Sequence, residues 1–268
     1  MYKREARIQE AFAFQIAKEL EQDDTVIGLA AGGSWLTNEM DEFSDLDLVV
    51  VTREKMTDDP VKMKAFARRF GNLLAAFTGE HVGEPRLLIC LYEDPFLHVD
   101  FKFLVLQELS IRIENPFILL DKEQVLQKIL EQSEAKFPYP DYQWIEDRFW
   151  TWIHYGLLKI GRGELTEAHD FLASLRMMVL GPLLHIKNGQ LPRGVRKAEM
   201  AFAEEDMEAL AATMASLEPL SLISAIEQSV GLYSRLRSIL FNDKIVLQYA
   251  AREKVLQYLE DIRSRASR

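Results

Sequence analysis

The sequence contains one cysteine, Cys90, so no disulfide can form within the chain of 268 residues. A lone cysteine inside an apolar run is typical of a buried small hydrophobe in a reducing compartment. The sequence also lacks an apolar run long enough to cross a membrane. Near the start, Ile8, Phe12, Ile16 and Leu20 give an amphipathic helical pattern in place of the apolar core of a secretory signal. These absences predict a soluble, cytoplasmic protein without a membrane partner.

The sequence has fewer basic residues (32 Lys and Arg) than acidic ones (42 Asp and Glu), so the formal net charge is -10 at pH 7. A protein that binds long nucleic acid needs a basic surface to neutralise phosphates, so this class of partner is excluded. An acidic surface is compatible with metal ions or with a cationic small molecule, and it also promotes solubility.

The first informative stretch is an apolar run, Val26 to Ala31, followed by Gly32-Gly33-Ser34. The run predicts a buried strand that ends at the glycines. Glycines let the backbone approach an anion closely, and a helical turn starting near Ser34 would direct backbone N-H groups and the serine hydroxyl at a phosphate. The stretch therefore indicates a phosphate-binding turn.

A second strand is predicted where Asp45 and Asp47 precede and enter a Val-rich run. Residues two apart in a strand leave the same face, roughly 6 to 7 Å apart along the chain. Carboxylates on such a surface need a cation or hydrogen-bond donors, because burial of an isolated charge is costly. A divalent metal ion, and Mg²⁺ in particular, satisfies this need while bridging to substrate phosphates.

A third acid lies in the strictly alternating segment Leu97 to Val105. His98, Asp100 and Lys102 occupy one face of this predicted strand, and the apolar residues occupy the other. Asp100 is therefore the candidate third carboxylate, and His98 is a candidate for the rim of the site or for a structural hydrogen bond.

The sequence has a strand, a Gly-Gly-Ser turn and an Asp-Leu-Asp strand in this order. With this order of features it resembles the nucleotidyltransferase superfamily. The resemblance implies that Asp45, Asp47 and Asp100 hold two Mg²⁺ ions, with the proton acceptor open between Asp100 and an acid of the helical bundle. It also implies that Gly32, Gly33 and Ser34 bind the triphosphate of ATP or another nucleoside triphosphate. Lys159, on a later helix, is a further candidate contact for the nucleotide, although a solvated helix face is the commoner role for such a lysine.

The remaining patterns predict two architectures in series. Strands are expected at 25–31, 46–52, 85–92 and 97–106, and helices at 2–21, 58–78, 123–134, 141–161, 164–187, 203–217, 219–241 and 245–265. The first part forms a small mixed sheet with flanking helices, and short connections between the later helices favour an antiparallel bundle. We therefore expect an α+β protein with a nucleotidyltransferase (catalytic) domain at 1–138 and a helical, substrate-binding bundle at 139–268.

Taken as a whole, the chain is similar to the aminoglycoside and lincosamide nucleotidyltransferases, which include adenylyltransferases. Ile118 to Lys122 and the aromatic segment Arg148 to Trp152 add to this resemblance. It implies transfer of AMP from ATP to a hydroxyl of a small molecule, and the acceptor is open between such an antibiotic and another hydroxylated compound. Two other hypotheses are a non-catalytic, antitoxin-like relative and a helical RNase that uses Arg148 and His154.

Overall fold

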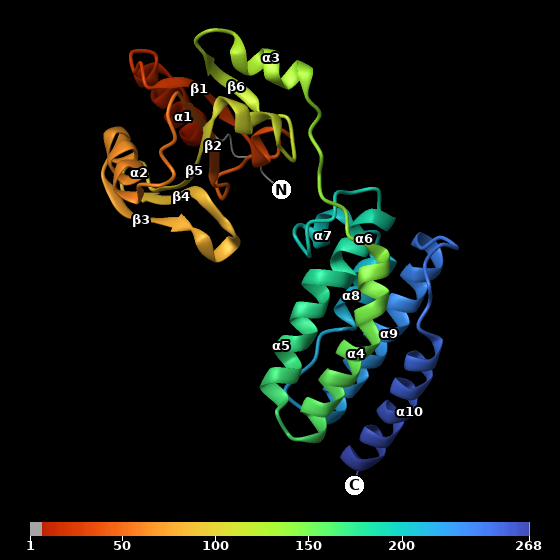
Figure 1. Cartoon of the computed structure of the whole chain (residues 1–268). Helices are drawn as coiled ribbons and strands as arrows, with labels where there is room; N and C mark the ends of the chain where they lie inside the picture. The colour runs from red at the N-terminus through yellow and green to blue at the C-terminus, as the bar shows by residue number, and fades with distance from the viewer. Residues whose placement is uncertain (1–6, 268) are drawn as a thin grey trace. The chain divides into compact units, whose positions relative to one another are not determined.

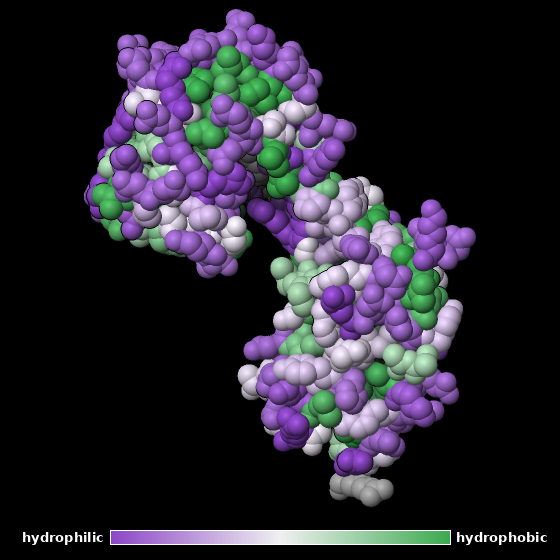
Figure 2. Space-filling model, in the orientation of Figure 1, coloured by the Kyte–Doolittle hydropathy of each residue, from purple (hydrophilic) through white to green (hydrophobic). Residues whose placement is uncertain are grey.

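The computed structural model describes residues 7–267, which divide into two compact units between Phe137 and Pro138 (Figure 1). The predicted helix at 2–21 is present as α1, Arg7–Leu20, and its first part lies outside the described residues. In the space-filling view, the visible face of the first unit is mostly hydrophilic with a few apolar patches, and that of the second unit mixes hydrophilic, intermediate and apolar residues (Figure 2). No described helix is both long and apolar enough to span a bilayer.

The first unit is built on a six-stranded mixed sheet in the order β3-β4-β5-β2-β1-β6. Its strands are β1 (Val26–Ala31), β2 (Leu46–Thr52), β3 (Leu73–Gly79), β4 (Glu84–Tyr92), β5 (Leu97–Val105) and β6 (Phe117–Asp121). β2 and β5 are parallel neighbours at the centre of the sheet, whereas the other neighbouring pairs are antiparallel.

Helices cover both faces of this sheet. α1 and α2 (Pro60–Ala67) pack on one face, where Phe12, Ile16 and Phe66 join the inward residues of β2 and β5 in a buried core. α3 (Val125–Gln132) packs near β6 on the other face, where a smaller cluster includes Val51, Leu104 and Leu126. Alternate residues of β2 and β5 thus face two different environments, which confirms the alternation predicted for 97–105.

The expected helix at 58–78 is wrong in its second half. Asp59 caps α2 by accepting hydrogen bonds from Val61 N and Lys62 N, as predicted for a helix start. The helical part then ends in a short 3₁₀ turn, Arg68–Phe70, and Gly71 adopts an extended backbone that leads into β3. Glycine is a poor helix former, so the turns of helix stop here and the edge strand pairs with β4 instead.

Other expected helix boundaries also need correction. The segment at 164–187 divides into α5 (Leu165–Leu175), a π-helical turn (Arg176–Leu180) and α6 (Gly181–Lys187), where proline at position 182 supplies no N-H for a regular helical bond. The remaining helices are α4 (Tyr142–Gly161), α7 (Ala198–Ala201), α8 (Glu204–Ala211), α9 (Pro219–Leu240) and α10 (Tyr249–Ala266). Residues 117–121, expected only to precede a helix, form β6.

The second unit is a helical bundle with a buried carboxylate in its core. Glu146 has no exposed surface. It accepts hydrogen bonds from Trp150 Nε1 at 3.3 Å, Arg237 at 3.1 Å, Gln248 N at 2.9 Å and the Tyr233 hydroxyl. Because its charge is paired and its oxygens are satisfied, Glu146 links α4, α9 and α10 as a structural group.

We predict that Glu146→Ala lowers the free energy of unfolding by roughly 3–5 kcal/mol, because it leaves Arg237 without its buried partner. Urea unfolding followed by circular dichroism measures this change. The neighbouring Asp147→Ala, which removes an exposed acid that contacts Gln143 and Gln248, is the control with an expected loss below about 1 kcal/mol. Equal losses in the two variants would contradict a structural role specific to Glu146.

Candidate active site

Two of the candidate carboxylates lie directly opposite each other on adjacent strands. The parallel register of β2 and β5 pairs Asp47 with Asp100 and Leu46 with Val99. Leu46 and Val99 belong to the core beneath α1 and α2, so Asp47 and Asp100 point to the opposite face, where both are partly exposed. Neighbouring strands are separated by only about 4.8 Å. The structure therefore brings these two acids together on one face of the sheet.

Asp45 precedes β2, and its charge acts on the carboxyl group of Asp100. The pKa of Asp100 is raised above its ordinary value, mainly because the carboxyl is partly buried. His98 opposes this shift through its charge and a 2.9 Å contact from Nε2 to Asp100 Oδ1, whereas the negative charge of Asp45 raises the pKa further. Asp45 and Asp100 therefore interact electrostatically, and a cation bound between them would weaken their repulsion.

The Gly-Gly-Ser turn lies against Asp47. Gly32 N donates a hydrogen bond of 2.9 Å to the backbone oxygen of Asp47. Gly33 has φ +59°, and a Cβ atom at this residue would lie 2.0 Å from Asp47 Oδ2. Only glycine fits this turn without strain, because the left-handed backbone and the close carboxylate each disfavour a side chain. Ser34 continues the turn as part of a short 3₁₀ segment, Gly33–Trp35.

Trp35 explains how the turn is fixed in place. Its ring lies 6.0 Å from the ring of Phe14 on α1 and 5.9 Å from the ring of Phe117 on β6. A large aromatic residue directly after Ser34 therefore ties the turn to two other elements of the first unit, and it leaves the glycine backbone beside the acids.

A fourth carboxylate, absent from the candidates taken from the sequence, also contacts the turn. Glu114 Oε1 accepts a 2.9 Å hydrogen bond from Gly33 N. Glu114 comes just before β6, and β6 pairs with β1 so that Phe117 lies opposite Ala31. No local sequence pattern predicts this contact, because it joins residues 81 positions apart that a strand pairing brings together.

Lys159 belongs to the second unit, where its ammonium group is already paired. It lies 2.7 Å from Glu164 and 3.0 Å from Glu167, and 5.0 Å above the ring of Tyr155. Hydrogen bonds from Lys159 to these two acids raise its pKa. Lys159 could contact a triphosphate only by exchanging these partners.

The residues considered for RNase chemistry have separate surroundings in the bundle. The Arg148 guanidinium lies 4.2 Å from the centroid of the Trp144 ring, and the His154 ring packs 5.0 Å from that of Tyr258.

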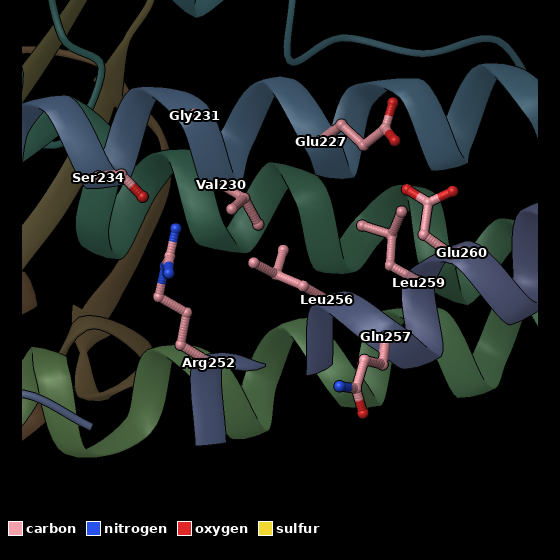
Figure 3. A pocket seen from close by; sticks show the side chains of 9 residues that line it. All are labelled: Glu227, Val230, Gly231, Ser234, Arg252, Leu256, Gln257, Leu259 and Glu260. Atoms are coloured by element: carbon pink, nitrogen blue, oxygen red, sulfur yellow. The ribbon is translucent and has the colours of Figure 1, made fainter. Parts of the chain in front are cut away.

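A groove between α9 and α10, with a volume of about 620 Å³, contains none of the candidate site residues (Figure 3). Leu256 and Val230 lie at its centre, and Arg252 extends along one end toward Ser234. Arg252 Nε is buried without a hydrogen-bond partner among the described residues.

Within residues 7–267, no group of three or more His, Cys, Asp or Glu side chains is arranged to enclose a metal ion. One oxygen of Asp47 lies against Gly33, and one oxygen of Asp100 contacts His98. The donor chemistry nevertheless fits Mg²⁺, which takes carboxylate oxygens and keeps several other ligands from water and phosphate. The acids are therefore suitable for a metal that is completed by its substrate.

A family model described as a nucleotidyltransferase domain matches residues 14–148, which span β1, the glycine turn, β2 and β5. The chain belongs to the nucleotidyltransferase domain family. This membership confirms the resemblance expected from the Gly-Gly-Ser and Asp-Leu-Asp motifs, and the mixed sheet followed by a helical region confirms the α+β fold class.

Three solved structures are similar at low identity. An aminoglycoside 6-adenyltransferase from Bacillus subtilis is 16% identical with a TM-score of 0.39, and the alignment covers 97% of this chain and 98% of that one. A nucleotidyltransferase-like protein from Exiguobacterium sibiricum is 14% identical, with a TM-score of 0.36 and coverage of 85% and 75%. A spectinomycin adenyltransferase from Enterococcus faecialis, solved with ATP and spectinomycin, is 13% identical, with a TM-score of 0.32 and coverage of 86% and 98%. No curated protein matches the chain.

We predict that Gly33→Ala displaces the Asp47 carboxylate, in addition to a loss of about 1–2 kcal/mol from the left-handed backbone. Gly83→Ala is a matched control, because Gly83 also has positive φ but open space around its Cβ position. The midpoint temperature of thermal unfolding should fall in both variants. Added Mg²⁺ and ATP should raise this temperature in wild type and in Gly83→Ala but not in Gly33→Ala. Retained stabilisation in Gly33→Ala would contradict the contact.

The raised pKa of Asp100 predicts that Asp100→Asn stabilises the metal-free protein at pH 7. When the pKa of a carboxyl is higher in the folded state than in the unfolded state, the folded protein loses stability as the pH rises above the pKa of the unfolded state, about 3.9. Asparagine removes this cost, so the gain should shrink below about pH 4. Urea unfolding in EDTA at both pH values measures it, and an equal difference at both would contradict the electrostatic cause.

Proposed function

We propose that this protein transfers AMP from ATP to a hydroxyl group of a small molecule. The observation that supports this most directly is the pairing of Asp47 with Asp100 on neighbouring strands beside the Gly32-Gly33 turn. Membership of the nucleotidyltransferase domain family agrees with nucleotidyl transfer as the reaction class. The first unit is then the catalytic part of the chain.

Asp45, Asp47 and Asp100 are the residues that would hold Mg²⁺. When bound, the metal ions would neutralise the triphosphate and the oxygens that attack and leave. The repulsion between Asp45 and Asp100 supports this assignment, because two carboxylates that repel each other gain from a cation between them.

The protein residues have separate roles in this proposal. The backbone of Gly32 and Gly33, with Ser34, binds phosphate oxygens. Asp100, or an acid of the helical bundle, accepts the proton of the attacking hydroxyl. The hydroxyl oxygen forms a bond to the α-phosphorus, the bond between the α-phosphorus and the bridging oxygen breaks, and pyrophosphate leaves. Placement and charge neutralisation supply most of the acceleration.

The second unit is proposed to bind the acceptor. An aminoglycoside-like or lincosamide-like compound supplies the required hydroxyl, and the net charge of -10 favours a cationic acceptor over a nucleic acid. Lys159 is proposed as a nucleotide contact that exchanges Glu164 and Glu167 for phosphate oxygens. Thermal-shift screening of nucleoside triphosphates with Mg²⁺, followed by a panel of hydroxylated antibiotics, identifies the substrates, because a ligand that binds the native state raises its stability.

With the acceptor identified, Asp47→Asn should lower kcat about 100-fold or more, because several kcal/mol of charge stabilisation in the transition state depend on the metal. Release of pyrophosphate measures the rate. Asp24→Asn makes the same charge change at an exposed residue before β1 and should retain wild-type activity. A folded Asp47→Asn variant with wild-type turnover would exclude the carboxylate site, and wild-type protein inactive toward every acceptor would favour a non-catalytic relative.

A further inference from the structure

Glu114 occupies the place where a phosphate oxygen would bind the glycine turn. Its Oε1 atom lies 2.9 Å from Gly33 N and is the acceptor of that backbone hydrogen bond. The same oxygen would lie 3.1 Å from a Cβ atom built on Gly32, so the carboxylate rests on the turn itself. A carboxylate oxygen and a phosphate oxygen are both anionic acceptors for a backbone N-H, and one donor serves only one of them well.

The segment that carries Glu114 is held firmly in position. Arg112 donates to Asn115 Oδ1 at 2.8 Å, to Ser133 Oγ at 2.6 Å, and to the backbone oxygens of Leu130 and Ser133. The backbone oxygen of Arg112 in turn accepts a 2.9 Å hydrogen bond from Lys136 N. These bonds tie residues 112–115 to the end of α3, while β6 ties the next residues to β1. Glu114 is therefore presented to the turn from both sides by fixed backbone.

Two carboxylates lie at this turn. Asp47 already lies against Gly33 on its other side, as shown by the clash of a Cβ atom at Gly33 with Asp47 Oδ2. Glu114 adds a second carboxylate to the same turn through its hydrogen bond with Gly33 N. Like charges at this separation raise the free energy of a bound anion.

We propose that Glu114 is a built-in competitor of the triphosphate: its carboxylate must leave Gly33 N before a phosphate oxygen can bind, and it thereby sets the affinity for the nucleotide. This inference rests on the proposed nucleotidyl transfer at the same site. It assigns to Glu114 a role in the strength of nucleotide binding and not in the chemical step.

The test compares the full-length wild type with Glu114→Gln and Glu114→Ala. Glutamine keeps the length and an oxygen acceptor but removes the charge, and alanine removes both. Glu131→Gln on α3 is the control, because Glu131 is exposed and contacts only Gln127 in its hydrogen bond. Binding of an ATP analogue with a methylene bridge between the α- and β-phosphates, in the presence of Mg²⁺, is measured by calorimetry.

We expect Glu114→Gln to bind the analogue about tenfold more tightly than wild type, which corresponds to 1.4 kcal/mol. Glu114→Ala should bind at least as tightly as Glu114→Gln, and Glu131→Gln should match wild type. The affinities of these proteins for inorganic tripolyphosphate, measured without metal, should follow the same order, because Glu114 competes for the turn and not for the metal. The ¹⁵N amide signal of Gly33 should shift in both Glu114 variants without ligand.

Three results would overturn the proposal. Unchanged binding in folded Glu114 variants would make Glu114 a structural residue, and weaker binding would make it a contact for the nucleotide or its metal. In both cases, loss of turnover in Asp47→Asn would leave the proposed function intact. Failure of wild type and all variants to bind either probe would instead reject nucleotidyl transfer together with the role of Glu114.

Discussion

The parallel pairing of β2 with β5 is the constraint on which the site depends. It places Asp47 level with Asp100, and the alternation of each strand directs both side chains away from the core formed with α1 and α2. The pKa of Asp100 is raised by its partial burial and by the charge of Asp45, while His98 opposes the shift. Buried aliphatic neighbours fix the two strands, so the fold holds Asp47 and Asp100 level with each other.

The glycine turn and the segment before β6 complete this arrangement from the other edge of β2. β1 lies between β2 and β6, and the turn that follows it contacts Asp47 on one side and Glu114 on the other. Trp35 and Arg112 are the anchors for the two segments. Both anchors are structural, yet they determine where the negative charge lies relative to the backbone donors of the turn. The groove between α9 and α10 is a separate feature, which involves neither the acids nor the turn.

Much of this architecture could be predicted from the sequence because its signals are local. Alternation in Leu97–Val105 revealed the strand and its polar face, and the strands expected at 85–92 and 97–106 are present as the antiparallel neighbours β4 and β5. The sequence failed where a local pattern was ambiguous: Leu73 and Phe77 fit a helical stripe but belong to edge strand β3, because tertiary pairing with β4 outweighs the local preference. The contact of Glu114 could not be found, since it follows from the pairing of β6 with β1 and not from any spacing.

The proposed activity requires Asp45, Asp47 and Asp100 to bind a divalent metal together with a nucleotide beside the Gly32-Gly33 turn. The most direct test is the anomalous diffraction of a crystal grown with Mn²⁺ and a non-hydrolysable ATP analogue. The account predicts an anomalous peak about 2.1–2.2 Å from carboxylate oxygens of Asp47 and at least one other of these acids, with phosphate oxygens on the same ion. A bound nucleotide whose metal lies away from these three side chains would contradict it.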